Sequence, residues 1–407
     1  MKEKMGRRKF LGITGMGVLG YLLYPDLKLL EALQGQLGKR NEIAEILKMV
    51  PNPNFSLVNS SIVPEALLHH PDNEQIVMPL NFGDLNIGVY GLGVQEAISR
   101  GQSVTLVLEQ PPKDRPQTSD QWRNYLREVL RLYQPSTFII GNECNVPPSY
   151  PTAVSPIEYL RLFQVAQEEI NRLSPKTKIF LYGDAHWGEG EYLAAILRTL
   201  KISKVPFDGI ALHYYDTADK LLTRIEQFRG ILQKYDFNQK SIIISELGKP
   251  ENYRLTAEQY STAMVQLLST AGFLISQGKI ESAFWYTAAT FDPTKQEHAL
   301  FQFSRYFNGR LEAVQGVFSY LLVSRFLHHG VSLENYRGLT IVRGVNAGGR
   351  ETAAVWNRTR NLLFYPLSAG RTAFDLDGKK LDIFNHLVPA YPSLEPQKCS
   401  GRPFFVI

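Results

Sequence analysis

Two glutamates stand at positions where a charge is costly unless the protein uses it. Glu143 closes the run T-F-I-I-G-N-E at residues 137–143, and Glu246 closes the run S-I-I-I-S-E at residues 241–246. A short, continuous apolar run that ends at polar residues is typical of a strand buried on both faces. A carboxylate at the carboxyl end of such a strand indicates chemistry. Two such ends, far apart in the sequence, indicate one site that a parallel barrel assembles.

The chain alternates strand patterns with helix patterns. Candidate strands cover residues 55–59, 75–81, 103–109, 137–143, 178–184, 208–215, 241–246 and 282–287. Strands that alternate with helices predict parallel pairing through right-handed crossovers, and eight such units match an α/β fold, the (β/α)8 TIM barrel. The alternative is an open, doubly wound sheet. That fold favours a glycine-rich phosphate loop after an early strand, which this sequence lacks.

Three of the intervening helices have start signals in the sequence. Thr118–Gln121 and Thr256–Gln259 have the capping-box pattern, and Ser155 precedes Pro156 at a first helical position. Gly278 stands where the helix after Thr256 should end. These signals set the beginnings of three crossover helices.

Beyond residue 331 the pattern changes to short strands separated by turn clusters such as Ala347–Arg350. A helical segment at Phe318–His328 precedes them. We predict a barrel over residues 51–330 and a small antiparallel β-sandwich over 331–407, whose last strand, Pro403–Ile407, packs back against the barrel. A linker or helix over residues 26–50 and a segment over 1–25 come before the barrel.

Residues at the carboxyl ends of barrel strands line the active-site face and are the candidate site. His213 and Tyr215 alternate onto one side of their strand, whereas Asp208, at the opposite end, is expected to be structural. His186 and Trp187, after the fifth strand, are expected to contact substrate. The strand-end candidates are Glu109, Asn142, Glu143, Asp184, His213, Tyr215, Glu246 and Trp285.

A pair of carboxylates across such a site suits glycoside hydrolysis. One ionised carboxylate attacks the anomeric carbon, and the other gives a proton to the leaving oxygen and later activates water. A tyrosine can hold the nucleophile by a hydrogen bond, a tryptophan can stack on the apolar face of a sugar ring, and an asparagine can bond the 2-hydroxyl. All three types occur among the strand-end candidates.

Four motifs resemble those of clan A glycoside hydrolases, which are retaining (β/α)8 enzymes, some with a C-terminal β-sandwich. The motifs are G-N-E on the fourth strand, H-Y-Y on the sixth, S-E-L-G on the seventh and F-W-Y on the eighth. The resemblance covers residues 100–290 well and extends loosely to the sandwich. It implies an enzyme that cleaves a β-linked glycan by double displacement.

The resemblance also implies a role for each matching residue. Glu143 corresponds to the acid/base and Glu246 to the nucleophile. The other implied roles are 2-hydroxyl binding by Asn142, support of the nucleophile by His213 and Tyr215, and a sugar platform formed by Trp285.

Other interpretations stay open. The second strand, M-P-L-N-F-G, lacks an Arg that many clan members carry there, so a degenerate barrel that binds a glycan at the cell surface without cutting it is the alternative. A membrane-tethered structural protein is a third class. Glu109 competes for a catalytic or sugar-binding role. Trp285 as barrel packing and His213 as a structural histidine are the ordinary alternatives.

The basic charge of the chain lies at its N-terminus. Five Lys or Arg precede the apolar run Phe10–Tyr24, and without this segment 39 basic and 38 acidic residues remain, so nothing indicates nucleic-acid binding. Arg7-Arg8 followed by an apolar run resembles a twin-arginine export signal, which predicts export across a bacterial plasma membrane. No small-x-small cleavage site precedes Pro25, so a cleaved signal and a membrane anchor both stay open, and with them a periplasmic, extracellular or anchored location.

Composition is ordinary for a globular protein, with 44% hydrophobic and 20% charged residues. Two cysteines, Cys144 and Cys399, have neither a disulfide framework nor metal-ligand spacing, and Cys144 is expected to pack rather than react. The expected partner is an oligo- or polysaccharide. No metal or cofactor is expected.

Overall fold

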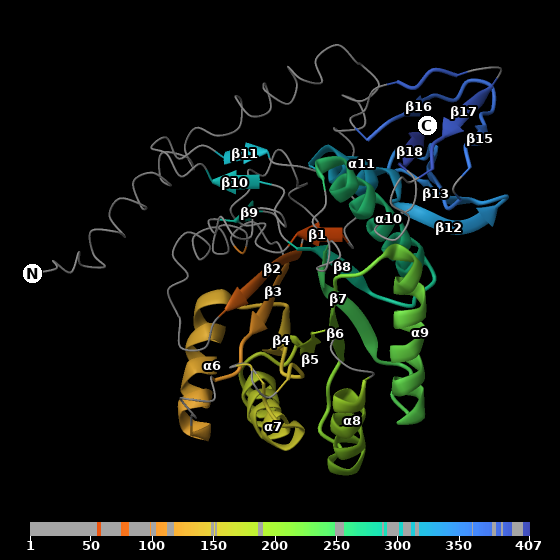
Figure 1. Ribbon diagram of the computed structural model, residues 1–407. Helices are drawn as coiled ribbons and strands as arrows, with labels where there is room; N and C mark the ends of the chain where they lie inside the picture. The colour runs from red at the N-terminus through yellow and green to blue at the C-terminus, as the bar shows by residue number, and fades with distance from the viewer. Residues whose placement is uncertain are drawn as a thin grey trace, which may run out of the picture.

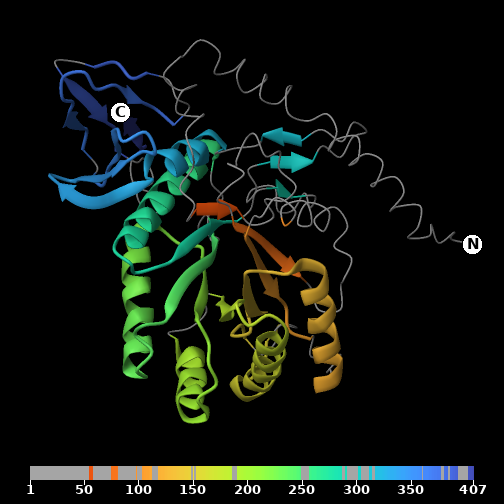
Figure 2. The same cartoon turned by 180° about the vertical axis from the view of Figure 1, so that it is seen from behind.

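The computed structural model describes residues 55–57, 75–80, 98, 103–111, 118–147, 150, 153–185, 190–248, 256–286, 289–290, 301–303, 311–313, 317–359, 361–376, 380–383, 386–392 and 402–407. This part of the chain is an α/β fold in which a curled parallel sheet with helices outside it is followed by a separate antiparallel domain (Figures 1 and 2).

Eight parallel strands form the curled sheet. They are β1 (Phe55–Leu57), β2 (Gln75–Leu80), β3 (Ser103–Leu108), β4 (Thr137–Asn142), β5 (Lys178–Asp184), β6 (Gly209–Tyr214), β7 (Ser241–Leu247) and β8 (Ser282–Trp285). Their order is β1-β8-β7-β6-β5-β4-β3-β2, so β8 returns to β1. A doubly wound sheet reverses its order at a switch point, so that alternative is wrong. Within the described residues no ladder joins β1 to β2, and the curled sheet is open at this seam.

Five helices of the described chain alternate with strands β3 to β8. They are α6 (Ser119–Tyr133), α7 (Pro156–Leu173), α8 (Glu191–Ser203), α9 (Ala218–Lys234) and α10 (Ala257–Ser276). The predicted caps are confirmed: Thr118 and Thr256 form capping boxes, and Ser155 caps α7. α8 and α9 begin without a side-chain cap hydrogen bond, although Thr217 stands at the N-cap of α9.

Alternation along the strands separates two apolar layers. The inner layer takes one residue from each of strands β3 to β8, namely Val107, Ile139, Phe180, Ala211, Ile243 and Phe284. Their sequence neighbours, such as Phe138 and Ile140, lie in the main core with helix residues such as Phe163. The inner layer fills the inside of the curled sheet, and the outer layer holds the helices on it.

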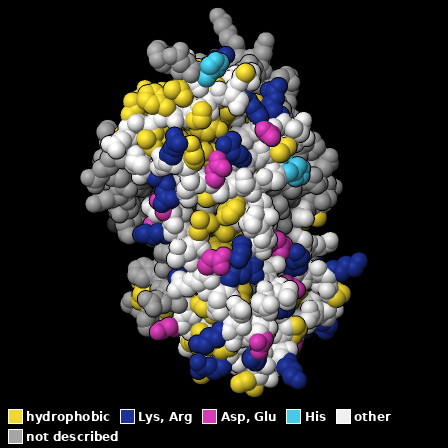
Figure 3. Space-filling model, turned by 90° about the vertical axis from the view of Figure 1, so that its right-hand side faces the viewer, with side chains coloured by type: hydrophobic (Ala, Val, Ile, Leu, Met, Phe, Trp, Pro, Cys, Tyr) yellow, Lys and Arg dark blue, Asp and Glu magenta, His cyan; other side chains and the backbone are white. Residues whose placement is uncertain are grey.

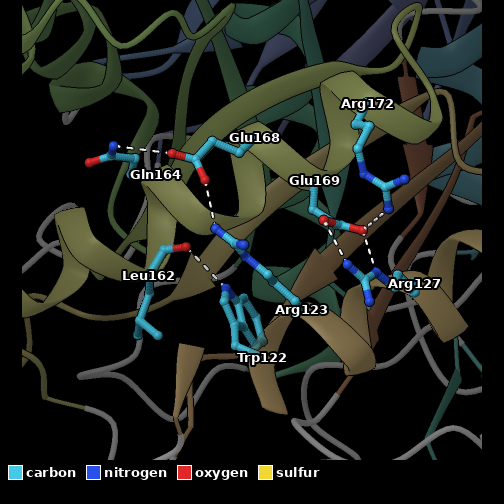
Figure 4. Close-up of polar contacts among 8 residues, drawn as sticks. All are labelled: Trp122, Arg123, Arg127, Leu162, Gln164, Glu168, Glu169 and Arg172. Carbon is cyan, nitrogen blue, oxygen red and sulfur yellow. Dashed lines mark hydrogen bonds and ion pairs between the residues drawn. The ribbon is translucent and has the colours of Figure 1, made fainter. Parts of the chain in front are cut away.

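A polar network joins α6 to α7 (Figure 4). The buried Trp122 indole N–H donates to the Leu162 carbonyl oxygen at 3.0 Å. The Glu169 carboxylate accepts from Arg127 at 2.5 Å and from Arg172. The hydrogen bond from Arg127 is the main cause that lowers the pKa of Glu169. This network fixes α6 and α7 to one another. The two helices precede and follow β4 in the chain, and Glu143 comes directly after β4.

The antiparallel domain follows α11 (Val317–Phe326). Its strands are β12 (His329–Tyr336), β13 (Leu339–Val345), β14 (Glu351–Asn357), β15 (Leu363–Pro366), β16 (Ala373–Phe374), β17 (Leu387–Ala390) and β18 (Phe404–Val406). A five-stranded sheet, β12-β13-β14-β18-β16, and a two-stranded sheet, β15-β17, share an apolar cluster that includes Val355, Tyr365 and Val388. Three short strands that the sequence did not predict form a further sheet: β9 (Ala289–Thr290), β10 (Phe301–Phe303) and β11 (Leu311–Ala313).

The two parts of the chain share a core. The ring of Phe405 in β18 packs against Phe326 of α11, with centroids 5.2 Å apart. The Ser276 hydroxyl at the end of α10 donates to the Val331 carbonyl oxygen in β12 at 2.5 Å. Phe405 and Ile407 belong to the same apolar cluster as the parallel strands. The predicted packing of the last strand against the part of the chain that holds the parallel sheet is therefore confirmed.

One side of the surface carries interspersed charges (Figure 3). Lys and Arg side chains lie among Asp and Glu, and hydrophobic side chains gather near the end that holds the antiparallel domain. Exposed apolar residues of that domain include Leu362, Phe364 and Tyr391. Among the described helices, none combines the length and the apolar character that a membrane crossing requires.

Candidate active site

Glu143 follows β4 directly, on a backbone that bends sharply. Gly141 has a φ of +94° and Glu143 a φ of +48°, both in the left-handed region that favours glycine. The Glu143 amide donates to the Gly183 carbonyl oxygen in β5 at 2.9 Å, which holds the bend. The Glu143 side chain is 37% exposed. The carboxylate is thus fixed at the strand end and stays accessible to a ligand.

Glu246 lies inside β7, and its side chain is only 12% exposed. The Tyr215 hydroxyl donates a hydrogen bond to Glu246 Oε2. A register shift between β6 and β7 follows Leu212 and sets His213 opposite Glu246. His213 and Tyr215 therefore both face Glu246, which confirms that they share one side of their strand.

His213 lies between the two glutamates. Its buried Nδ1 is 2.9 Å from Glu143 Oε1 and 3.5 Å from Glu246 Oε2. Burial lowers the pKa of His213, but the charge of Glu246 and the hydrogen bond with Glu143 outweigh burial and raise it. His213 therefore couples the two carboxylates electrostatically.

Two glycines make room for these side chains. A Cβ on Gly183 would lie 2.4 Å from His213 Nε2, and a Cβ on Gly248 would lie 2.6 Å from the Tyr215 ring. Neither distance is sterically tolerable, so the rings of His213 and Tyr215 reach Glu246 only because both positions lack a side chain. This gives a physical reason for the last residue of S-E-L-G.

The two carboxylates come close to one another. One ligand atom from each of Glu143, His213 and Glu246 lies within 4.8 Å of the other two. Such a set could also hold a divalent ion, because Zn²⁺ takes carboxylate oxygen and imidazole nitrogen. The spacing of the three residues in the sequence does not reveal this arrangement.

Asn142 also lies at this strand end, held through its backbone. Gln110 bonds both the N–H and the carbonyl oxygen of Asn142, at 2.8 and 2.9 Å. The Asn142 Oδ1 atom is buried and has no hydrogen-bond partner among the described residues. The side-chain oxygen is thus a hydrogen-bond acceptor that has no donor among the described residues.

The prediction for Trp285 is wrong. Its side chain is fully buried, and its indole N–H donates to the hydroxyl of Tyr260 on α10 at 2.9 Å. Trp285 therefore faces the helices and cannot form a sugar platform. Alternation instead places Tyr286 with the inner-layer residue Phe284, and the Tyr286 ring meets that of Tyr215 with centroids 6.1 Å apart. Tyr286 is not among the residues predicted from the sequence, although period-two alternation from Phe284 places it on the inner face.

Asp184 also differs from its predicted substrate-binding role. It is buried, and its Oδ2 accepts from Asn145 at 3.1 Å and from Tyr182 at 3.3 Å. Arg224 of α9 lies 3.6 Å from Oδ1. Asp184 therefore links β5 to the turn after β4 and to α9. Asn145 and Arg224, which the sequence analysis did not single out, take part in this link.

The remaining candidates lie near the site or outside the described residues. Glu109 is half-buried after β3, and its charge acts on Cys144. Burial is the main cause that raises the pKa of the Cys144 thiol, which fits a packing residue. Asp208 accepts the Ile179 amide at 2.7 Å, as expected of a structural residue. His186 and Trp187 lie outside the described residues.

Comparison with known proteins gives a likeness of fold at low identity. No family model matches the chain, and no curated protein matches its sequence. A family 39 glycoside hydrolase from Bacteroides cellulosilyticus is similar with a TM-score of 0.62 and 13% identity, over 88% of this chain and 81% of that one. A glucosidase from Croceicoccus marinus has a TM-score of 0.58 and 12% identity, over 83% and 90% of the two chains. An endo-β1,6-glucanase has a TM-score of 0.55 and 10% identity, over 88% and 91%.

Proposed function

We propose that this protein is a retaining glycoside hydrolase of the clan A type, with a (β/α)8 barrel and a C-terminal β-sandwich, that cleaves a β-glycosidic bond. The observation that carries the proposal is the proximity of Glu143 and Glu246, whose carboxylate oxygens approach within 4.8 Å. Retaining enzymes separate their carboxyl groups by about 5–5.5 Å, and inverting enzymes by about 6.5–9.5 Å. The nearest oxygens, within 4.8 Å of one another, fit the shorter of these two separations and support attack by one carboxylate.

Exposure and hydrogen bonding support the division of roles. Glu246 is mostly buried and is held by the hydroxyl of Tyr215. Burial and the charge of Glu246 raise the pKa of Tyr215, so the phenol stays protonated and donates its hydrogen bond to Glu246. A fixed, ionised carboxylate suits the nucleophile. Glu143 is more exposed, as a group that protonates a leaving oxygen and later activates water must be. Asn142 Oδ1 is an acceptor for the sugar 2-hydroxyl.

The likeness to glycoside hydrolases supports the same substrate class. The similar structures are described as a glycoside hydrolase, a glucosidase and a glucanase, and each is matched over most of its length. Since structures at such low sequence identity show a likeness of fold alone, the proposal for this chain rests on the Glu143–His213–Glu246 geometry. The substrate we propose is an oligo- or polysaccharide.

Substitution of each glutamate tests the proposal. We expect Glu246→Gln to abolish turnover of an aryl β-glycoside and Glu143→Gln to lower kcat by about 10²–10⁴-fold, the usual contribution of acid–base catalysis. Glu128→Gln, which removes a surface carboxylate paired with Arg131 on α6, is the matched control and should keep full activity. A screen of aryl glycosides that varies sugar and anomer supplies the substrate.

Chemical rescue separates the two roles. Azide should restore product formation in Glu246→Gly and give a glycosyl azide of inverted anomeric configuration. Full activity in either Gln variant would contradict the assignment. Sugar binding by the native chain without labelling of Glu246 by a fluoroglycoside would instead favour a barrel that binds glycans without cutting them.

We also propose that the chain acts outside the plasma membrane. The support is the basic, twin-arginine N-terminus followed by Phe10–Tyr24, which lies outside the described residues. The proposed organisation is an export signal or anchor over 1–25, a linker over 26–50, the barrel over 51–330 and the sandwich over 331–407. Fractionation of cells that express the native chain or an Arg7→Lys/Arg8→Lys variant tests it, since the variant should remain in the cytoplasm.

A further inference from the structure

A cavity of about 300 Å³ lies in the antiparallel domain and shares no residue with the candidate active site. Its lining combines strands of the five-stranded sheet with the end of β15 and the turn that follows. Polar groups come from Arg343, Tyr365, Ser368 and Arg371, and apolar groups include Val345, Leu367 and Val406. The volume lies at the lower end of small-molecule sites, which are about 300–1,000 Å³.

Hydrogen bonds hold both guanidinium groups in place. Arg343 donates to the Tyr365 hydroxyl at 3.1 Å and to Glu334 at 2.9 Å. Arg371 donates to the carbonyl oxygen and to the carboxylate of Glu351, both at 2.6 Å. A guanidinium that is already oriented loses less conformational entropy when it binds a ligand.

The lining holds two guanidinium groups with N–H donors beyond those bonded above. A guanidinium carries five N–H groups, and the bonds above use two on each arginine. The Tyr365 hydroxyl accepts from Arg343, so its own proton remains to be donated. Among the lining residues the carboxylate is that of Glu351, whose side chain is 77% exposed and pairs with Arg371, so the lining carries two guanidinium groups against one carboxylate. A ligand in this cavity must therefore bring acceptors, and preferably negative charge.

We propose that this cavity binds a carboxylate-bearing sugar, a uronic acid unit of a glycan. The planar fork of arginine matches the two oxygens of a carboxylate, and the wall of Val345, Leu367 and Val406 suits the C–H face of a pyranose ring. An inorganic anion would leave this apolar wall uncovered, and a neutral sugar would offer uncharged acceptors alone to the N–H groups of Arg343 and Arg371 that do not bond Glu334 and Glu351. The identification of the ligand as part of a glycan rests on the proposed function. The recognition of a carboxylate rests on the cavity alone.

Calorimetric titration of the full chain with D-glucuronate, D-glucose and sulfate tests the proposal. We expect saturable binding of glucuronate, with weaker binding of the other two. Arg371→Gln and Arg343→Gln should each weaken glucuronate binding by about tenfold or more, the loss expected for a charge-assisted hydrogen bond. Arg131→Gln removes a surface arginine paired with Glu128 and is the matched control, which should bind as the native chain does.

Three results would overturn the proposal: no saturable glucuronate binding, binding that both Gln variants retain, or sulfate or glucose that binds as tightly as glucuronate. If a Gln variant does not fold, Arg371→Lys keeps the charge without the fork and should still lose affinity. Turnover separates this proposal from the first. If glucuronate binding depends on the arginines but the chain has no glycosidase activity, the proposal for the cavity holds and the proposed function is wrong. If the chain is active but does not bind glucuronate in this way, the proposed function holds and the proposal for the cavity is wrong.

Discussion

At the scale of the residue, His213 links the charges of the site. It contacts Glu143 and Glu246 at once, so the charges of both carboxylates act on one imidazole. The sequence placed His213 at a strand end but did not show that one nitrogen would face both carboxylates. The register shift beside Ser245 decides this, and no local pattern in the two strands predicts it.

The raised pKa of His213 predicts how stability depends on pH. The folded chain holds this proton at pH values where the unfolded chain, with a histidine pKa of about 6.5, releases it. The stabilisation is therefore complete below about pH 6.5 and is lost as pH rises through the folded-state pKa. We expect the Tm difference between the native chain and His213→Asn to be largest near pH 6 and to shrink towards pH 9.

Thermal unfolding across this pH range is the measurement. Phe364→Ala, which changes an exposed side chain without a titratable group, is the control, and its Tm difference from the native chain should not vary with pH. A Tm difference for His213→Asn that grows with rising pH would mean that His213 is held neutral in the folded chain.

At the scale of the element, strand ends and glycines set the site. β4 and β7 each deliver one carboxylate, and β6 delivers the two side chains that hold Glu246. Gly183 of β5 leaves the space that the His213 ring fills. Alternation along the strands puts Ile139 and Phe284 on the inner face and Trp285 on the face towards the helices, whereas the platform role of Trp285 was implied by the family resemblance alone.

Gly183→Ala should therefore damage the site through His213. The new Cβ would lie 2.4 Å from Nε2 and force the ring away from Glu143 and Glu246. We expect a loss of about 1–3 kcal/mol of stability from overpacking and a fall in kcat of about 10²-fold from misplacement.

Gly230→Ala is the matched control, because a Cβ at this position of α9 meets nothing within 4 Å. It should raise stability by about 0.5–1 kcal/mol, since alanine favours helix, and leave kcat unchanged. Equal kinetics for the two variants would show that the position of His213 does not matter for turnover.

At the scale of the whole molecule, the antiparallel domain is part of the structure that holds the barrel. α10 packs along the sheet through Tyr260 and Trp285, and its last turn bonds β12. Phe405, near the end of the chain, is fully buried against α11. The two parts are therefore expected to unfold together.

Phe405→Ala tests this cooperation. Removal of a buried phenylalanine ring costs about 3–5 kcal/mol, and we expect a single thermal transition shifted to lower temperature, with activity lost in the same transition. Phe364→Ala, at a position 48% exposed on β15, is the control and should change little. Activity that survives the unfolding of the antiparallel domain would show that the barrel is stable alone.

The sequence by itself determined the strands of the parallel sheet, though not β9, β10 and β11, and it determined the pair of glutamates. Apolar runs closed by Glu143 and Glu246, and caps such as Thr118, depend on residues close in the chain, so local patterns predict them. Tertiary structure alone decided which groups touch, because contacts such as Glu143–His213 and Trp285–Tyr260 join distant segments through strand register and side-chain parity. The arginine-lined cavity was likewise decided by tertiary structure, since its walls come from strands that only folding brings together.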